Sequence, residues 1–367
     1  MPIRNGDCYL REAIESILNQ SIAELELVAV DDGSTDKTPH LLRDFASRDP
    51  RIRVFQQRGE GMVAALNVGV ANARAPLIAR MDCDDVASAD RLERQISSFE
   101  GRPTLVALGG QAIETNDTGA QRRFLRYPVG PRACRQQLEL SSPFCHPAVM
   151  FRKGAVLAVG GYRTAYRHAE DYDLWLRLSQ VGELDNLSGV VLKYRRHVGS
   201  TTYKNAKEQA QSTALAVLAA RLRSRGLGDP TPDNGWADAS LSEALATIQA
   251  SISEEHLAQL VYWRTLVLNG ALANPAELSA FRQVLPHLTD VARQLKAGRT
   301  FAFMMLRAAS LAARTREWLL AGECVLRSAA AAPAATAEQI IQRLARRPVY
   351  GDYGAVHETA RTTGAVL

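Results

Sequence analysis

The chain has 367 residues, of which 46% are hydrophobic and 23% are charged, and its mean hydropathy is -0.15. This composition is typical of a soluble globular protein long enough for two domains, and no run of about 18 apolar residues predicts a membrane span. The net charge of +5 is mild and lies mainly after residue 203. It argues against an extended nucleic-acid-binding face, but it leaves room for a weak attraction to anionic lipid or to a phosphate-bearing acceptor.

Cysteine usage and the N-terminal residues indicate the compartment. The cysteines are odd in number and lack the spacing of metal ligands; they are Cys8, Cys83, Cys134, Cys145 and Cys324. The first residues do not show the charged and then apolar layout of a signal peptide. The sequence therefore predicts a reduced protein in the cytoplasm, a location that includes the inner face of the membrane.

Strand and helix patterns alternate through the first 200 residues. Residues 7–20 have the apolar spacing of a helix with Asp7 as the expected N-cap, and the preceding residues 2–6 are typical of a turn that leaves a strand. No sequence precedes that turn, so the first strand is expected to be missing. Further strands are expected at residues 25–30, 52–55, 105–108, 145–151 and 190–194, and helices from Thr38 and at 61–73, 88–99, 153–159 and 168–178. This alternation predicts βαβ crossovers and a largely parallel sheet, with a basic loop at 121–131.

A short apolar run within residues 76–86 opens directly onto Asp82, Asp84 and Asp85. Such a run fits a buried strand, and ligands of α/β sheets bind at the carboxyl ends of strands. A turn at Cys83 would bring the carboxylates onto one hard divalent cation, which commonly also binds substrate phosphates. The pattern therefore indicates a diphosphate site. An isolated Asp-x-Asp equally fits a polar turn, because Asp is a common turn residue.

Other acidic residues begin the helix expected at 168–178. Glu170, Asp171 and Asp173 fall in its first turn, where acids are favoured by the helix dipole alone. After residue 204 the chain changes to Ala- and Leu-rich helical patterns, with helices expected at residues 261–272, 278–295 and 301–320, an alanine-rich hinge at 329–337 and a fraying tail after Pro348.

Taken in order, several segments resemble one known family. They are the start PIRNG, then LREAIESILNQS, VAVDDGSTD, GMVAALNVGVANA, ARMDCDD, HPAVMFRK, VGGY, AEDYDLWLRL and YRRH. This order and spacing resembles the inverting family 2 glycosyltransferases of bacterial type, which have the GT-A fold. The resemblance runs from Pro2 to Thr202. It implies a nucleotide-binding mixed sheet flanked by helices at residues 1–203, with a donor half at about 1–110 and an acceptor half at about 111–203. An all-helical region of unknown role follows at 204–367.

The resemblance assigns the donor site to two strand ends. Asp32 matches the residue that hydrogen-bonds the uracil of a UDP-sugar, and Asp31 stands beside it. Asp82 matches a residue near the ribose or the sugar. Asp84 matches the ligand of a divalent metal, Mg²⁺ or Mn²⁺, that bridges the diphosphate. Arg58 stands where relatives often have a polar residue that faces the nucleotide.

The resemblance also assigns the reacting and acceptor side. Asp171 matches the general base, with Glu170 as its neighbour, and His197 matches a basic residue that approaches the diphosphate or the metal. Trp175 is implied to stack on the acceptor sugar, although its helical spacing fits the core equally well. His146 is implied on the acceptor side as well, with a buried, hydrogen-bonded histidine as the alternative.

The resemblance implies a metal-assisted transfer of a sugar from a nucleotide-sugar to a glycan or lipid-linked acceptor, with no nucleic-acid partner and with peripheral membrane association left open. A phosphohydrolase would use the acids at 82–85 but would leave Glu170 and Asp171 without a role. A truncated, non-catalytic relative that binds a sugar nucleotide or a partner is the second alternative. Arg4 supports the non-catalytic alternative, because many relatives have an aromatic residue at that position. The expected loss of the first strand supports the same alternative.

Overall fold

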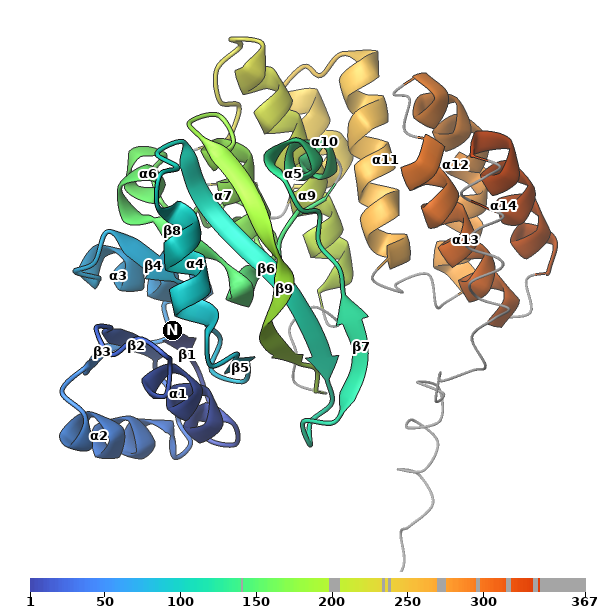
Figure 1. Cartoon of the computed structure of the whole chain (residues 1–367). Helices are drawn as coiled ribbons and strands as arrows, with labels where there is room; N and C mark the ends of the chain where they lie inside the picture. The colour runs from blue at the N-terminus through green and yellow to red at the C-terminus, as the bar shows by residue number, and fades with distance from the viewer. Residues whose placement is uncertain are drawn as a thin grey trace, which may run out of the picture. The chain divides into compact units, whose positions relative to one another are not determined.

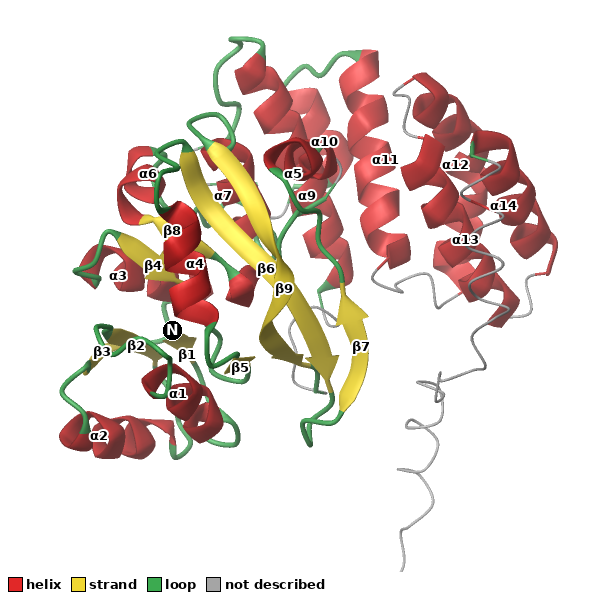
Figure 2. Cartoon of the chain, viewed as in Figure 1, coloured by secondary structure: helices red, strands yellow, loops and turns green. Residues whose placement is uncertain are grey.

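The computed structural model describes residues 1–139, 141–197, 205–232, 235–236, 239–268, 275–294, 298–314, 318–332 and 336. Contacts divide the chain into two compact units, Met1–Asn269 and Gly270–Leu367. The change from mixed strands and helices to helices alone follows the last strand, which ends at Arg195 (Figure 2), and it falls inside the first unit. Helices α9 (Ala206–Ser224), α10 (Leu241–Thr247) and α11 (Ile252–Leu268) therefore belong to the same unit as the sheets, and α10 and α11 pack on α9.

A parallel sheet occupies the N-terminal part of the first unit (Figure 1). Its strand order is β1 (Pro2–Ile3), β2 (Leu27–Asp32) and β3 (Ile52–Gln57). Helices α1 (Leu10–Leu18) and α2 (Thr38–Arg48) connect these strands, and α3 (Met62–Asn72) follows β3. Each crossover returns the chain through a helix to a parallel strand, as the alternation predicts.

The first residues differ from the expectation. Pro2 and Ile3, expected in a turn, form a short strand that pairs with β2. Helix α1 begins at Leu10 and not near Asp7. Residues 7–9 form a turn instead: the Gly6 C=O accepts hydrogen bonds from the N–H groups of both Tyr9 and Leu10, and Tyr9, with a φ of −123°, is outside the helical region.

A second, mixed sheet follows. Its strand order is β4 (Leu77–Ala79), β8 (Met150–Arg152), β6 (Leu105–Thr115), β9 (Glu183–Arg195) and β5 (Val86–Ala87), and β7 (Gln121–Leu125) pairs with β6. Among its described pairings only β6 and β9 are parallel. The prediction of a largely parallel sheet is therefore right for the first sheet and wrong for the second, where the chain returns by hairpins and long excursions. Helix α4 (Arg91–Phe99) covers the face toward the viewer in Figure 1, and α7 (Glu170–Leu178) lies on the far face.

Several strand boundaries depart from the sequence pattern. Residues 121–131, predicted as a loop, form edge strand β7 and the start of α5 (Pro131–Leu138), because an edge strand can expose polar side chains at almost every position. Strands β6 and β9 are longer than predicted, since buried polar residues such as Gln111 and Asn186 continue them. The strand expected at 145–151 is split into a 3₁₀ turn, η1 (His146–Ala148), and β8.

Two helices sit close to their predicted places. Helix α6 spans Lys153–Ala158. Helix α7 begins at Glu170, two residues later than expected, because His168 has a φ of 61° and left-handed backbone cannot start a right-handed helix.

The second unit is helical where it is described. It contains α12 (Pro275–Gln294), α13 (Gly298–Arg314) and α14 (Trp318–Ala331), and its buried residues include Phe281, Leu285, Phe301, Met305 and Cys324. Part of the expected alanine-rich hinge is thus the end of α14, while residues 333–335 and the tail after Pro348 lie outside the described residues. None of the helices in the described ranges is long and apolar enough to pass through a bilayer.

Candidate functional site

Three carboxylates meet in the loop between β4 and β5. Asp82, Asp84 and Asp85 each offer an oxygen, and these oxygens all lie within 4.8 Å of one another. The loop, here called the acidic loop, begins where the short strand β4 ends, as the apolar run before it predicts. The structure thus brings together the residues that the Asp-x-Asp-Asp pattern singles out.

Each carboxylate of the acidic loop has its own partner. Arg80, only 6% exposed, places a guanidinium nitrogen 2.5 Å from Asp82 Oδ2. His197 Nε2 lies 3.0 Å from Asp84 Oδ2, although the two residues are 113 positions apart in the chain. The Arg195 backbone N–H donates to Asp85 Oδ1 at 2.8 Å. The acidic loop is therefore held from several sides.

Burial and mutual repulsion make the acidic loop ready for a cation. Burial, together with the charge of Asp82, raises the pKa of Asp84, and the His197 contact opposes that rise. Burial and the charges of Asp82 and Asp84 raise the pKa of Asp85 well above its usual range. Packing three carboxylates this closely is unfavourable unless a positive charge joins them.

The donor set fits a hard divalent metal. Asp85 Oδ2 is buried and has no hydrogen-bond partner among the described residues. His197 Nε2 and Asp84 Oδ2, which lie 3.0 Å apart, would be available to hold such an ion together. Carboxylate oxygens are the ligands that Mg²⁺ and Mn²⁺ prefer, and an imidazole is compatible with the latter.

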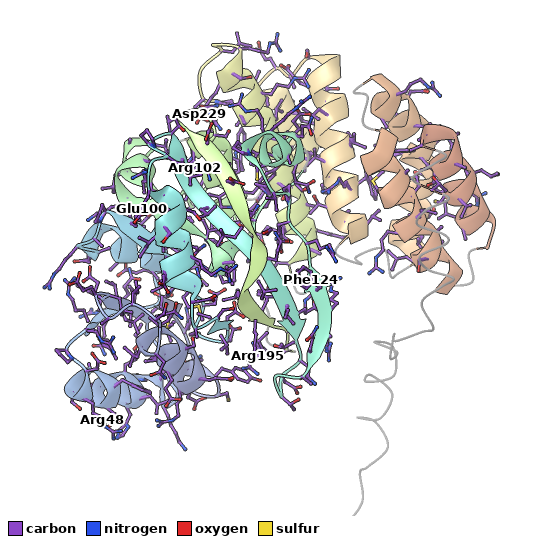
Figure 3. All side chains as sticks on the ribbon, viewed as in Figure 1. Arg48, Glu100, Arg102, Phe124, Arg195 and Asp229 are labelled. Atoms are coloured by element: carbon purple, nitrogen blue, oxygen red, sulfur yellow. The ribbon has the colours of Figure 1, made fainter. Side chains whose placement is uncertain are left out.

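Arg195 joins the acidic loop to its surroundings, a role that the sequence pattern did not assign. Its Nε–H donates to the Asp84 C=O at 2.9 Å and one of its terminal N–H groups to the Asp117 C=O at 2.9 Å. The other end of the guanidinium pairs with Glu12 of α1, and the group stacks over the Tyr9 ring at 4.6 Å. Figure 3 shows Arg195 at the lower end of β9. Its place in YRRH, two residues before His197, was the available signal.

The first turn of α7 supplies the second pair of acids. Asp171 Oδ1 accepts from the Tyr172 N–H at 2.7 Å, and no side-chain partner is found for Glu170 within the described part of the chain. Both side chains are half-buried. Burial and the charge of Asp171 raise the pKa of Glu170 to about 7, and burial also raises the pKa of Asp171. A carboxylate with a raised pKa is a better proton acceptor near neutral pH.

Arg80 links the two acidic clusters electrostatically. Its charge lowers the pKa of both Glu170 and Asp171 and opposes the effect of burial there. The same charge is paired with Asp82 of the acidic loop. Arg80 is therefore close enough to both acidic clusters for its charge to act on each of them. Arg80 stands two residues before Asp82, yet the sequence pattern did not mark it.

Tyr162 positions the segment before α7. The Asn67 side chain of α3 accepts from the Tyr162 N–H and donates to its C=O, both at 2.9 Å. Gly161 precedes it with a φ of 69°, and a Cβ there would lie 2.8 Å from Asn67 Oδ1, so a side chain would break this contact. The Tyr162 hydroxyl meets His146 Nε2 at 3.0 Å. This contact ties η1 to the same region.

Three of the residues considered for this region have partners within the fold. Asp173 is fully buried and pairs with Arg163 and Arg177, so it is not a helix cap. Trp175 is 0% exposed and packs edge-on against Phe144, with ring centroids 5.2 Å apart, which favours its core alternative over stacking on a sugar. His146 is half-buried and lies within hydrogen-bond distance of the Tyr162 hydroxyl, and its desolvation lowers its pKa well below the usual range.

The end of β2 forms a separate polar region near the end of β3. Asp32 accepts backbone N–H groups from Glu60 and Gly61 at 2.7 and 2.9 Å, and Arg4 lies 3.6 Å from it. Asp31 accepts from the Ser34 N–H at 3.0 Å and shapes the turn.

The loops after β2 and β3 touch. Gly33 has a φ of 72°, and a Cβ there would lie 3.0 Å from the Gly59 nitrogen. Arg58, beside Gly59, is exposed. The predicted donor residues Asp31, Asp32 and Arg58 therefore gather at one end of the parallel sheet.

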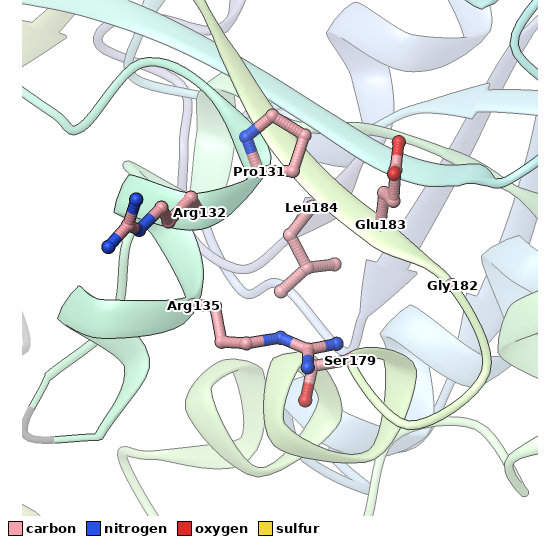
Figure 4. Close-up of a pocket in the computed structure, with 7 residues that line it drawn as sticks. All are labelled: Pro131, Arg132, Arg135, Ser179, Gly182, Glu183 and Leu184. Atoms are coloured by element: carbon pink, nitrogen blue, oxygen red, sulfur yellow. The ribbon is translucent and has the colours of Figure 1, made fainter.

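A pocket of 270 Å³ lies elsewhere (Figure 4). It is lined by Pro131, Arg132, Arg135, Ser179, Gly182, Glu183 and Leu184. Ser179 follows the C-terminal end of α7, whereas the acids stand at its N-terminal end about 13 Å away by helix rise. This pocket is not part of the acidic site.

Comparison with known proteins agrees with the geometry. The sequence model of the family described as glycosyl transferase family 2 matches residues 1–159. The amylovoran biosynthesis glycosyltransferase AmsE of Erwinia amylovora is 33% identical over 188 residues, covering 51% of this chain and 70% of that protein. The O-antigen biosynthesis glycosyltransferase WbnJ of Escherichia coli is 33% identical over 206 residues, covering 55% of this chain and 80% of that protein.

The fold also has solved relatives. The crystal structure of residues 1–349 of TarS from S. aureus matches with a TM-score of 0.53 and 16% sequence identity, covering 89% of each chain. A complex of the same protein with UDP-GlcNAc matches with a TM-score of 0.54. At this identity the likeness concerns the fold alone.

Proposed function

Because the chain belongs to the family 2 glycosyltransferases, we propose that it transfers a sugar from a UDP-sugar to a hydroxyl of a glycan or lipid-linked glycan, with inversion at the anomeric carbon. The chain is a glycosyltransferase, since AmsE and WbnJ, both 33% identical and largely covered by it, are such enzymes. The names of these relatives support a polysaccharide acceptor. The UDP-GlcNAc complex of the structural relative supports a UDP-linked donor.

One observation carries the proposal. Arg80 is paired with Asp82 of the acidic loop, and its charge also acts on Glu170 and Asp171 in the first turn of α7. An inverting transfer needs a group for the leaving diphosphate on one side of the anomeric carbon and a base for the acceptor hydroxyl on the other. In this proposal the two clusters would supply both.

The donor side is proposed to use residues from two strand ends. Asp32 would accept a hydrogen bond from the uracil ring, with Asp31 and Arg58 nearby, and Asp82 would lie near the ribose or the sugar. Asp84 and His197 would hold Mg²⁺ or Mn²⁺. When bound, this metal would stabilise the negative charge that develops on the leaving diphosphate.

Asp171 is proposed as the general base. Its carboxylate would accept the proton of the acceptor hydroxyl while the hydroxyl oxygen bonds to the anomeric carbon and the bond to the diphosphate oxygen breaks. This single displacement inverts the anomeric configuration. Burial raises the pKa of Asp171 and so favours acceptance of a proton there, while burial and the charge of Asp171 raise the pKa of its neighbour Glu170 to about 7.

The test is a calorimetric titration of UDP into the full-length chain, with and without Mn²⁺. We expect binding that strengthens with the metal, and weaker metal dependence in Asp84→Asn. An exposed control, Asp90→Asn, should bind as the unmodified protein does, because Asp90 lies outside the acidic loop. Unchanged UDP binding in the presence and absence of metal would contradict the metal assignment. No binding at all would favour the non-catalytic alternative or a different nucleotide.

Stereochemistry is tested separately. Once a donor sugar is found by screening UDP-sugars, the anomeric configuration of the product can be read by NMR before it equilibrates. Inversion is expected, and retention of configuration would contradict a single displacement.

A further inference from the structure

The segment that follows the β6–β7 turn is strongly basic. Between Asp117 and Glu139 it contains no acidic residue and five arginines, namely Arg122, Arg123, Arg126, Arg132 and Arg135. Arg123 is paired with Glu114 across the strands at 2.7 Å. Arg122 and Arg126 are also exposed, on β7 and just after it. The arginines on and just after β7 therefore present positive charge along one edge of the second sheet, whereas Arg132 and Arg135 lie on α5 and line the pocket of Figure 4.

Apolar side chains are exposed among these arginines. Phe124 is 40% exposed, and the Arg126 guanidinium lies over its ring, 5.0 Å from the centroid. Val129 is 51% exposed a few residues further along. Figure 3 shows Phe124 on β7, at the edge of the sheet. Arginine and aromatic side chains next to one another suit a boundary where apolar and charged surroundings meet.

Protection of the sheet edge explains only part of this surface. Arg122 falls where the register between β6 and β7 is interrupted, and charged residues and bulges on edge strands commonly prevent unwanted pairing. Edge protection does not explain an exposed Phe124 or Val129. A soluble polyanion would likewise pair with the arginines and leave the apolar groups in water, whereas an anionic bilayer receives both kinds of side chain.

We infer that Arg122, Phe124, Arg126 and Val129 form a surface, the β7 surface, that docks on a bilayer rich in anionic lipid. The arginines pair with lipid phosphate groups, and the Phe124 ring enters the interface between headgroups and acyl chains. The attraction is expected to weaken with salt, because it depends on charge.

The position of the β7 surface adds a functional consequence. The β6–β7 turn is connected to the acidic loop through Arg195, which donates to the Asp117 C=O and to the Asp84 C=O, both at 2.9 Å. Docking would thus hold the acidic loop close to the membrane. The suggestion that docking serves a lipid-linked acceptor rests on the proposed function, whereas the docking itself does not.

The test is sedimentation of the full-length protein with vesicles of phosphatidylcholine alone or mixed with phosphatidylglycerol. We expect binding to the anionic vesicles. The double variant Arg122→Gln/Arg126→Gln should reduce the binding affinity about tenfold or more, because it removes the attraction of two arginines to anionic lipid. Phe124→Ser should reduce binding severalfold, most visibly at higher salt, where charge is screened.

Matched controls come from the same unit. Arg43→Gln/Arg48→Gln removes two exposed arginines of α2, and Leu157→Ser removes an exposed apolar residue of α6 that is 51% exposed. These variants should bind vesicles as the unmodified protein does. Thermal unfolding of each variant checks that the fold is retained.

Three outcomes would overturn the inference. They are absence of binding to anionic vesicles at low salt, an equal loss in the control variants, and a loss in Arg122→Gln/Arg126→Gln with no effect of Phe124→Ser. The last would show that the contact with the vesicle is electrostatic alone, without entry of the Phe124 ring. The UDP titration needs no lipid, so a failure of docking is distinguishable from a failure of the proposed function.

Discussion

The acidic loop and the first turn of α7 both present neighbouring carboxylates, but the fold holds the two sets differently. In the acidic loop, Asp82, Asp84 and Asp85 each contact a basic side chain or a backbone N–H from elsewhere in the fold. In α7, Asp171 accepts the N–H of the next residue, and the Trp175 side chain also lowers the pKa of Asp171, while Glu170 shows no side-chain partner in the described residues.

This difference suits the acidic loop to binding a metal and the first turn of α7 to accepting a proton. Ligands of a metal act best when fixed, because binding then costs little reorganisation. A general base must instead be free to gain a proton, and burial without strong partners raises its pKa toward neutrality. The two regions therefore differ in chemistry although both are built from acidic residues, and each prediction below tests that contrast.

The largest effect is expected from Asp171→Asn. Loss of the base should lower kcat about 10²- to 10⁴-fold, while UDP binding stays unchanged because the acidic loop is intact. A transfer assay and the UDP titration measure the two quantities. Glu100→Gln, an exposed change at the end of α4 (Figure 3), is the control. Full activity of Asp171→Asn would show that another group accepts the proton.

Asp173→Asn tests the contrast within the same helix. Asp173 is fully buried between Arg163 and Arg177, and removing its charge leaves these cations without their carboxylate. The free energy of unfolding should fall by about 3–5 kcal/mol, as measured by urea denaturation. The activity per folded molecule should change little. Undiminished stability together with lost turnover would instead give Asp173 a chemical role.

His197→Gln should weaken metal binding at the acidic loop without removing a carboxylate. Loss of the contact with Asp84 is expected to lower the Mn²⁺ affinity about 10- to 100-fold, read from UDP titrations at increasing Mn²⁺. His40→Gln, an exposed change on α2, should leave it unaltered. If both variants behaved alike, His197 would have no part in the metal site.

The smallest effect concerns pH and Glu170. Because the folded pKa of Glu170 is raised to about 7, its contribution to stability is fully present below its unfolded value and is lost as the pH rises through about 7. Glu170→Gln should lack this loss and so gain stability over the unmodified protein by roughly 1–3 kcal/mol at pH 8, with little gain at pH 4. Thermal melts at the two pH values measure it, and an equal difference at both would contradict the raised pKa.

Local patterns were sufficient for part of this molecule. The alternation of apolar runs predicts the strands and helices of the first sheet, and the apolar run before Asp82 predicts a strand end with acids. The acids at the start of α7 follow from helix spacing, with an error of two residues at His168. Such features depend on neighbouring residues only, and a sequence displays them directly.

Only the tertiary structure decided the rest. The antiparallel pairings of the second sheet, the contact between His197 and Asp84, and the joining roles of Arg80 and Arg195 link residues far apart in the chain. Helical spacing also leaves Trp175 equally suited to the core and to a sugar, and packing against Phe144 places it in the core. Periodicity shows which face of an element is apolar. It does not show which element covers that face, because pairing and packing depend on the whole chain.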